Sequence, residues 1–547
     1  MSSASAPLRR FTPELLATVL IVVAYIAWLL SLPAWPSQDG PVHLYYTHVL
    51  GALLSHQPTP YTHFYTIKHL LPPYALYYYA LLALSKAVPL LMADRLIVCV
   101  YVVLFVSGFR YVAQTVGPSA DLMTLLATLL ALNWSVGMGF VNFCLALALV
   151  LWAIGLWLRL RDARLVPRVI FLLLVAAITL THPVSLVLLL AFCGIDVVQR
   201  MLWRRTGVDA RRAPLGIDML TLGVSSLAAV YVWFFTAAHP LQQTQASAHT
   251  FGAAVRGHVE AIVRLHHLML LSGSSAPLIF YRVVLLAIPL IGLALAGMQR
   301  LRNGAAQRWT PGDTWLVLSL ALIIIVPVLP SDISNAYFFT ERLTILLWIV
   351  PLLAASGWSP ARGRRSFSVV GITLLAVAGN ISLLWTANRI LRPIAMQVTP
   401  GGEAKSPASG ELALVLEDSR APFALPEGPS WNPYYWAPVH RIRQESAVLD
   451  NAPWLNSAII PLGASGALSG ATLDEMDSIS PSHLSSSLRE RPEMRAQVLA
   501  PLNLVFIEQP GLPPPAALDP VLTGTSEGWV CHVARAGWYQ RCTRSHS

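Results

Sequence analysis

An aspartate near the N-terminus, Asp39, lies in a stretch of turn-forming residues. The stretch reads Pro36-Ser37-Gln38-Asp39-Gly40-Pro41-Val42-His43 and directly follows the first long apolar run. A proline before Asp39 and Gly-Pro after it restrict the backbone, so the carboxylate can be aimed into a cavity. Such a carboxylate can act as a general base or as a metal ligand, and His43 is the second candidate catalytic residue. An ordinary Asx turn or helix cap would use the same residues, and the sequence leaves this alternative open.

A second candidate, Arg342, has the chemistry to bind a phosphate. It ends the stretch Tyr337-Phe338-Phe339-Thr340-Glu341-Arg342, at the start of an apolar run. A guanidinium binds phosphate oxygens in pairs, and a charge at the edge of a membrane span is costly unless it is used or paired. The alternatives are a salt bridge with Glu341 or Asp332, or snorkelling of the side chain to the membrane surface.

Four further residues are candidates for binding a substrate or a lipid phosphate: Glu341, His182, Asn142 and Glu260. His182 precedes Pro183 at a helix end, where packing or capping is the alternative role. Glu260 lies four residues before Arg264, and this spacing supports a helix salt bridge. For Glu260 the structural role is favoured over a catalytic one.

The composition excludes a single large water-soluble globule. Of the 547 residues, 55% are hydrophobic and 12% are charged, whereas a soluble domain carries about a quarter charged residues. The apolar residues come in separate runs long enough to cross a bilayer, which takes about 20 residues each. The net charge is +10, but the basic residues cluster between apolar runs, as membrane topology demands. We therefore expect membrane lipid as a partner and no nucleic acid.

These runs predict an α-helical polytopic membrane protein with about 11 transmembrane helices plus interfacial helices. The predicted spans cover residues 15–32, 93–112, 122–132, 140–157, 169–180, 184–198, 220–235, 278–296, 314–329, 343–355 and 369–385. The first run follows Arg9 and Arg10 without a convincing cleavage site, so we expect an uncleaved helix with a cytoplasmic N-terminus.

Residues 74–91 are apolar too, but a crossing there would invert every later loop. We expect an interfacial or re-entrant helix, with Tyr77-Tyr78-Tyr79 in the aromatic belt at the membrane surface. The alternative is an ordinary span paired with a second one that the pattern misses.

Threading the spans alternately places every strong basic cluster on one side of the membrane. The arginines of these clusters are Arg110, Arg159, Arg161, Arg164, Arg168, Arg200, Arg204, Arg205, Arg211, Arg212, Arg300, Arg302, Arg308, Arg362, Arg364 and Arg365. Basic loops stay cytoplasmic. The outer loops of a transmembrane domain at residues 1–394 are then about 33–92, 236–277 and 330–340, and they carry the candidate site.

From residue 395 to 547 the composition changes to that of a soluble domain. Strand-like runs at residues 412–416 and 504–507 predict a small α/β or α+β extracytoplasmic domain. Ten residues separate Cys531 from Cys542, a spacing that a hairpin can bring into disulfide geometry. A disulfide fits an oxidising compartment outside the cytoplasm. The other cysteines, Cys99, Cys144 and Cys193, lie in apolar runs and are expected to be buried packing residues.

The organisation of the N-terminal half resembles the GT-C superfamily of membrane glycosyltransferases, which includes protein O-mannosyltransferases and lipid A aminoarabinose transferases. The matching stretches are Asp39 at the opening of the first outer loop, Leu71-Pro72-Pro73-Tyr74, the short outer turn Asn133–Asn142, and Thr181-His182-Pro183. The resemblance implies a polyprenyl-phosphate sugar as the donor, with Asp39 in the place of the family's base.

The sequence departs from the family pattern at two acidic positions. Gly40 follows Asp39 where many relatives carry a second acidic residue, and Asn142 stands where many carry an aspartate. No cofactor is certain. A divalent metal remains compatible with the family pattern, with ligands drawn from His43, His63 or His69.

The resulting prediction is a glycosyltransferase of the bacterial inner membrane. It would move a sugar from a polyprenyl-phosphate donor to an acceptor glycan, lipid or protein on the extracytoplasmic face. Two alternatives remain: a transporter or flippase of lipid-linked saccharide, and a non-catalytic assembly protein of GT-C architecture. Few intramembrane charges and no internal symmetry disfavour the transporter, whereas the missing acidic residues favour the assembly protein somewhat.

The predicted sidedness can be tested by cysteine labelling in intact cells. A cysteine introduced beside Asp39 should react with a membrane-impermeant reagent, and one beside Arg204 should not, because basic loops remain in the cytoplasm. The reverse labelling pattern would overturn the topology and the sugar-transfer prediction with it.

Overall fold

The computed structural model describes most of the chain up to residue 398 and five strands beyond it. The described residues are 12–32, 35, 37, 39–55, 67, 69–160, 165–204, 215–237, 251–270, 275–303, 310–331, 338–358, 365–398, 412–417, 447–449, 502–508, 529–533 and 539–544.

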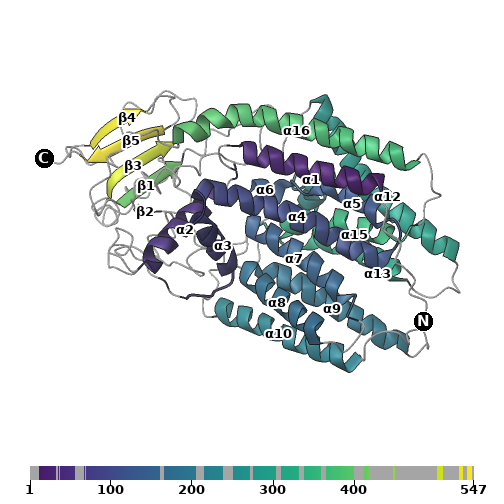
Figure 1. The fold of residues 1–547 in the computed structure, drawn as a ribbon. Helices are drawn as coiled ribbons and strands as arrows, with labels where there is room; N and C mark the ends of the chain where they lie inside the picture. The colour runs from purple at the N-terminus through teal and green to yellow at the C-terminus, as the bar shows by residue number, and fades with distance from the viewer. Residues whose placement is uncertain are drawn as a thin grey trace.

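Long helices lie roughly side by side in one bundle, and α16 runs along its length (Figure 1). The first helices are α1 (Pro13–Ser31), α2 (Gly40–Leu54), α3 (Ala75–Ser85), α4 (Leu90–Val116), α5 (Ala120–Ala127), η2 (Thr128–Leu130), α6 (Trp134–Gly137) and α7 (Val141–Trp157). The later helices are α8 (Leu165–Thr181), α9 (Pro183–Arg204), α10 (Leu215–Ala237), α11 (Phe251–Val263), α12 (Ala276–Asn303), α13 (Pro311–Val328), α14 (Phe339–Leu343), α15 (Leu346–Ala355) and α16 (Arg365–Val398).

The helices confirm a polytopic membrane protein. Among the described residues, seven helical segments are long and apolar enough to cross a membrane. All eleven predicted spans fall on helical segments, although the number of crossings stays a prediction. Helix α3 has 11 residues, which is about 16 Å and too short to cross a bilayer. This length fits the interfacial helix expected within residues 74–91.

Local sequence signals place several helix starts. Thr12 caps α1 by accepting a hydrogen bond from the backbone N–H of Leu15, and Pro13 follows at the first helical position. At α13, Thr310 and Asp313 form a capping box ahead of an apolar run. These residues satisfy N–H groups that have no partner within the helix.

Described arginines that border the predicted basic loops lie at one end of the bundle. The Arg110 guanidinium on α4 pairs with Asp121 on α5 at 2.8 Å, and Asp121 also accepts from Thr12 at the start of α1 at 3.0 Å. Arg159, after α7, lies over the ring of Tyr111 at 3.8 Å. The ends of α4 and α7 and the starts of α1 and α5 therefore share this end.

Contacts from the second half of the chain reach the same end. Arg302 on α12 lies over the ring of Trp358, after α15, at 4.7 Å, and the Trp358 carbonyl accepts from the Ser119 hydroxyl before α5. Thr314 on α13 donates to Gln199 on α9 at 3.0 Å. We call this end, marked by Arg110, Arg159 and Arg302, the basic end. Which side of the membrane it faces stays a prediction.

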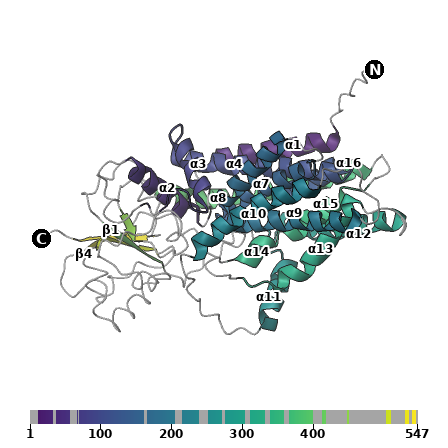
Figure 2. The same ribbon diagram turned by 90° about the horizontal axis from the view of Figure 1, so that it is seen from below.

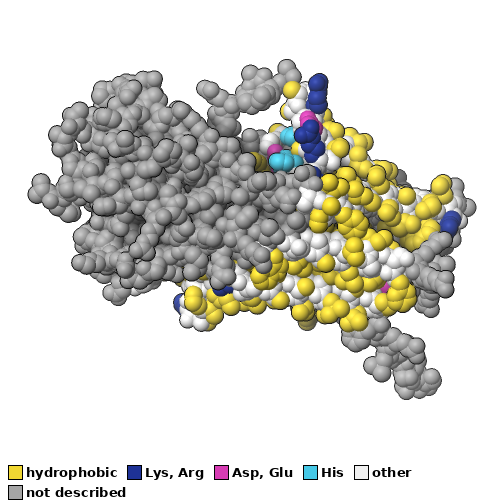
Figure 3. Space-filling view, turned by 90° about the horizontal axis from the view of Figure 1, so that it is seen from above, with side chains coloured by type: hydrophobic (Ala, Val, Ile, Leu, Met, Phe, Trp, Pro, Cys, Tyr) yellow, Lys and Arg dark blue, Asp and Glu magenta, His cyan; other side chains and the backbone are white. Residues whose placement is uncertain are grey.

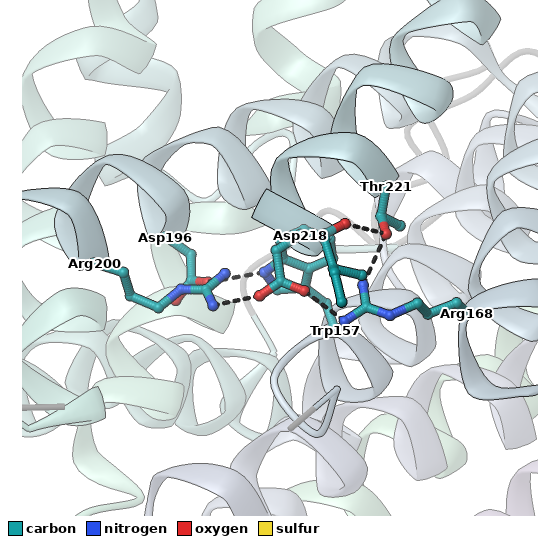
Figure 4. A network of polar contacts seen from close by, with 7 residues as sticks. Trp157, Arg168, Asp196, Arg200, Asp218 and Thr221 are labelled. Atoms are coloured by element: carbon teal, nitrogen blue, oxygen red, sulfur yellow. Dashed lines mark hydrogen bonds and ion pairs between the residues drawn. The ribbon is translucent and has the colours of Figure 1, made fainter. Parts of the chain in front are cut away.

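A buried ion-pair network joins α7, α8, α9 and α10 near the basic end (Figure 4). Asp218 receives the guanidinium groups of both Arg168, at 2.8 Å, and Arg200, at 2.5 Å. Arg200 also pairs with Asp196 at 2.8 Å, and Asp196 accepts from the Trp157 indole N–H at 2.9 Å. The network holds two positive and two negative charges, and because each is paired and hydrogen-bonded, the four helices can bury them away from water.

The outer surface of the bundle suits contact with lipid. The space-filling view shows a broad hydrophobic face along the helices, with charged side chains gathered at its ends and edges (Figure 3). At the C-terminal end of α10, Trp233 and Phe234 are 65% and 70% exposed. Exposed aromatic side chains at a helix end are typical of the membrane–water boundary.

Beyond α16 the five described strands form one sheet in the order β2-β1-β3-β5-β4. Strands β2 (Ala447–Leu449), β1 (Leu412–Glu417) and β3 (Leu502–Glu508) are parallel, and β5 (Tyr539–Arg544) and β4 (Trp529–Val533) are added antiparallel. The sheet lies at the end of the bundle where α2 and α3 are found (Figures 1 and 2). Strands β1 and β3 cover the two predicted strand runs, whereas α16 continues past the predicted domain boundary at residue 395.

The hairpin expected from the cysteine spacing is present. Cys531 on β4 is the register partner of Cys542 on β5. Directly opposite residues of an antiparallel pair have Cα atoms about 4.5–5.5 Å apart, which is within the range of a disulfide. The bond itself stays a prediction.

The network around Asp218 predicts a large difference between two carboxylate substitutions. Asp218→Asn leaves two buried guanidinium groups without their shared charge and should lower the free energy of unfolding by about 3–5 kcal/mol. Glu260→Gln removes an exposed ion pair, in which the side chains of Arg264 and Glu260 are 74% and 54% exposed, and should cost less than about 1 kcal/mol. Thermal unfolding of the purified protein checks both; equal losses would show that the buried network does not hold the four helices together.

Candidate functional site

Asp39 lies directly before α2, at the end of the bundle opposite the basic end. Its backbone N–H donates to the Met138 carbonyl at 3.0 Å, in the turn between α6 and α7. Gly139 in this turn has φ +87°, and a Cβ there would come within 2.8 Å of the Gly40 nitrogen. Two backbones can therefore approach closely only because residue 139 is glycine.

The side chain of Asp39 does not play the simple capping role. Asp39 occupies the N-cap position of α2 but makes no side-chain capping hydrogen bond. A second anchor holds the same segment, because the indole N–H of Trp35 donates to the Val136 carbonyl at 3.2 Å. The local backbone is thus fixed from the α6 side, as the Pro and Gly-Pro residues predicted.

Arg342, on α14, has an unusual set of partners for a buried cation. Its Nη1 lies 3.2 Å from Nε2 of His182, and its guanidinium carbon lies 3.9 Å from the centre of the Phe140 ring. Neither partner is a carboxylate. Within the described part of the chain Arg342 has no ion pair, and the predicted alternative partner Asp332 lies outside it. A guanidinium held by a ring face and an imidazole keeps its positive charge available to an anion.

Glu341 makes no ion pair with Arg342 among the described residues; it ties α14 to the end of α13 instead. Its Oε1 accepts from the Ser331 hydroxyl at 2.6 Å. The Thr340 hydroxyl donates to the carbonyls of Leu329 and Pro330, both at 2.9 Å. Glu341 is therefore placed to hold the short helix that presents Arg342, and its other oxygen, Oε2, has no partner among the described residues.

His182 lies fully buried between α8 and α9. Because its Nε2 faces an Arg342 donor, the imidazole must be neutral and carry its proton on Nδ1. That Nδ1 has no partner within the described residues. Burial and then the Arg342 charge keep the pKa of His182 well below its ordinary value. The rings of Tyr74 and Phe143 pack on it, each with centroids 5.2 Å away.

His43 is also a neutral, buried histidine. Its Nδ1 lies 2.8 Å from the Tyr78 hydroxyl, and burial, followed by the Arg342 charge, lowers its pKa to about 3. Burial and then the Asp39 charge raise the pKa of Tyr78. Tyr78 therefore contacts His43 through its hydroxyl and is close enough to Asp39 for the Asp39 charge to act on it.

Asp39 and Arg342 also act on each other. Burial lowers the pKa of Arg342, and the charges of Tyr74 and Asp39 oppose that shift. The structure thus brings Asp39, His43, His182 and Arg342 into one electrostatically coupled group, which we call the Asp39–Arg342 site.

The other two candidates lie differently. Asn142 is buried in the first turn of α7, two residues beyond Phe140, and its Oδ1 accepts from the Phe143 N–H at 2.8 Å. Glu260 lies on α11 and forms an exposed ion pair with Arg264 at 2.6 Å. Asn142 therefore borders the Asp39–Arg342 site, whereas Glu260 makes the helix salt bridge that its spacing predicted.

The described residues do not fit a bound metal. Among them, no group of three or more His, Cys, Asp or Glu side chains could hold an ion. The candidate ligand His43 is engaged with Tyr78, His69 packs on Phe235 with ring centroids 5.1 Å apart, and His63 lies outside the described residues.

Tyr74 and Tyr78 were not among the predicted site residues, and the expected place of the Tyr77-Tyr78-Tyr79 triplet in the aromatic belt was wrong for two of its members. Tyr77 and Tyr78 are each 1% exposed, because the inner face of α3 packs on α2 and α4, whereas Tyr79 lies nearer the surface and donates to the Leu70 carbonyl at 2.7 Å. Tyr74, which packs on His182, follows the Pro72-Pro73 pair that marked this segment in the sequence. Its left-handed φ of 76° is a sign of local strain, which is common at functional sites.

Comparison with known proteins identifies the fold. Among solved structures, ArnT from Cupriavidus metallidurans, bound to undecaprenyl phosphate, matches with a TM-score of 0.53 and 12% identity over 97% of this chain and 98% of that chain. The arabinofuranosyltransferase AftD from Mycobacteria matches with a TM-score of 0.45 and 16% identity; the match covers 99% of this chain but only 40% of AftD. No family model matches the sequence, and no curated protein does. The chain therefore has the fold of the ArnT structure, as its resemblance to the lipid A aminoarabinose transferases predicted.

The buried, neutral His43 predicts a specific acid sensitivity. Its pKa is lowered in the folded protein, so the unfolded chain binds the extra proton and stability falls as the pH drops from about 6.5 toward 3. His43→Gln cannot be protonated, and it should lose about 2 kcal/mol less stability than the wild type between pH 7 and pH 5. Unfolding of both proteins at the two pH values checks this. Equal losses would mean that His43 titrates normally.

Proposed function

We propose that this protein transfers a sugar from a polyprenyl-phosphate donor to an acceptor on the extracytoplasmic face of the bacterial inner membrane. The acceptor would be a glycan, a lipid or a protein. The observation that carries the proposal is Arg342: a buried guanidinium with no carboxylate partner among the described residues, electrostatically coupled to Asp39 at one end of a GT-C bundle.

The environment of Arg342 favours a phosphate as its missing anion. A guanidinium donates to two phosphate oxygens at once, and these hydrogen bonds strengthen as the surroundings become less polar. The imidazole of His182 holds one edge of the guanidinium, and Phe140 covers one face. A phosphate attached to a lipid could reach this position from the membrane, with its tail remaining among the acyl chains.

Asp39 would supply the base. Its carboxylate takes the proton from the acceptor hydroxyl or amine, whose lone pair attacks the anomeric carbon of the sugar. The bond from that carbon to the phosphate oxygen breaks, and the electron pair leaves with the polyprenyl phosphate. Arg342 stabilises the negative charge that grows on the leaving oxygen. Tyr78 and His43 remain neutral and position the Asp39 side of the site.

The fold supports the same donor class. The similar ArnT structure is bound to undecaprenyl phosphate, a polyprenyl phosphate of the kind that Arg342 would hold here. In this arrangement the N-terminus is cytoplasmic and the C-terminal domain is extracytoplasmic, so the basic end faces the cytoplasm.

The proposal predicts the activities of two substitutions. Asp39→Asn should lower transfer from a radiolabelled polyprenyl-phosphate sugar by about 10²–10⁴-fold, because the amide cannot act as a base. Arg342→Gln should lower it by about 10²–10³-fold, because the leaving phosphate loses its cation. Both proteins should insert and purify like the wild type, and Glu260→Gln is the matched control expected to keep activity.

Purified protein in detergent micelles separates this function from its rivals. Sugar release in micelles requires chemistry, because micelles have no second compartment for a transporter to fill. Wild-type turnover by Asp39→Asn, or no donor turnover by the wild type with any lipid-linked sugar, would sink the assignment.

A further inference from the structure

Helix α11 is amphipathic, with an apolar stripe and a charged face, and the proposed function assigns no role to it. Phe251, Val255, Val259 and Val263 recur at every fourth residue and so form one stripe along the helix. Phe251, Val259 and Val263 are 71%, 43% and 61% exposed, and no residue of α11 is buried. An apolar stripe of this kind is stable only if something other than water covers it.

Contacts with α13 place α11 at the level where a membrane span ends. Nδ1 of His258 lies 3.1 Å from the Pro327 carbonyl, and Pro327 is in the last turn of α13, a candidate span. The side chains of Ile324 and Val328 next to this contact are 70% and 43% exposed, as expected of a lipid-facing surface. The apolar stripe of α11 therefore continues the lipid-facing surface of α13.

The face of α11 beside this stripe is charged. Arg256 and Glu260 follow each other at a four-residue spacing, and Glu260 pairs with Arg264 just beyond the helix end. These side chains are exposed and leave one net positive charge, which suits a surface of lipid phosphates. A mixed patch of basic, acidic and histidine side chains stands out beyond the hydrophobic face of the bundle (Figure 3). In Figure 2, α11 stands at the edge of the bundle beside α13.

We propose that α11 is an interfacial helix that lies in the membrane plane, with Phe251, Val259 and Val263 among the lipid acyl chains and Arg256 and Arg264 among the headgroups. With 13 residues it is about 20 Å long and cannot cross the bilayer. Its apolar arc and its charged arc instead match the two sides of the boundary between headgroups and hydrocarbon. This inference stands whether or not the protein transfers a sugar.

The same helix would set the depth of the Asp39–Arg342 site in the membrane. Beyond α11 the chain turns at Leu265, which has a left-handed φ of 58°, and the Leu268 carbonyl accepts from the Trp134 N–H at 3.2 Å. The Trp134 ring packs on Phe140, with centroids 5.7 Å apart, and Phe140 lies under Arg342. A short, packed path therefore links the membrane contact of α11 to the guanidinium.

Spin labels on adjacent residues of α11 test this placement. Four single variants of the full chain would carry a nitroxide: Val259→Cys, Val263→Cys, Glu260→Cys and, as a lipid-facing reference on α13, Ile324→Cys. Each is reconstituted into vesicles of phosphatidylcholine with phosphatidylglycerol. Collision rates with oxygen, which concentrates in hydrocarbon, and with a water-soluble nickel complex are then measured. The native cysteines Cys99, Cys144 and Cys193 are buried, and labelled wild-type protein gives the background.

The ratio of oxygen to nickel collision rates is expected to reverse between the apolar stripe and the neighbouring residue 260. Labels at residues 259 and 263 should collide with oxygen more than with nickel, as at residue 324, whereas the label at residue 260 should show the opposite ratio. If residues 259 and 263 are as accessible to nickel as residue 260, the stripe faces water and the proposal is wrong. If both are shielded from oxygen and nickel alike, protein covers the stripe, and the proposal is equally wrong.

Discussion

The cost of placing charge in hydrocarbon organises this molecule. A charged side chain inside a bilayer must be paired, solvated or used, because the surroundings cannot replace its water. At the basic end, Arg110, Arg159 and Arg302 find carboxylates or aromatic faces. Arg168 and Arg200, which lie deeper, share Asp218 and Asp196 in a balanced network. Each of these cations is accounted for by its partners.

Arg342 is the exception that marks the opposite end. It is held as firmly as the others, by His182, Phe140 and the short helix that Glu341 ties to Ser331. Its partners, however, carry no negative charge. The cost of placing a charge in hydrocarbon favours ion pairs for the other arginines, and for the same reason Arg342 would favour binding an anionic group carried by a membrane lipid. The two histidines around it, His43 and His182, are neutral, so neither forms an ion pair with the guanidinium.

The structure gives a physical reason for the two positions at which the sequence departs from the GT-C pattern, Gly40 and Asn142. Gly40 stands where many GT-C glycosyltransferases have a second acidic residue, and the Cβ of any other residue there would meet the Ser37 hydroxyl at 2.1 Å. The Asp39 loop instead packs closely on the turn at Gly139. Asn142 keeps a polar group beside Phe140 without adding a charge. The site thus pairs the carboxylate of Asp39 with the guanidinium of Arg342, and its two histidines are neutral.

Patterns along the sequence that have a direct physical cause predicted the helices and the grouping of the loops. Runs of apolar residues predicted the helices, because only a helix satisfies its own backbone in lipid, and the arginine clusters predicted which loops share an end. The turn chemistry around Asp39 and the position of Arg342 at the edge of a span singled out two residues whose charges act on each other in the structure, and their catalytic roles stay predictions. Three facts became visible only once the helices were packed together. Tyr77 and Tyr78 face inward, and His182 rather than Glu341 contacts Arg342. Glu260 lies outside the site. Those facts depend on how separate helices pack, since Arg342 and His182 are 160 residues apart in the chain, and no local pattern records which distant side chain will fill the space beside a given residue.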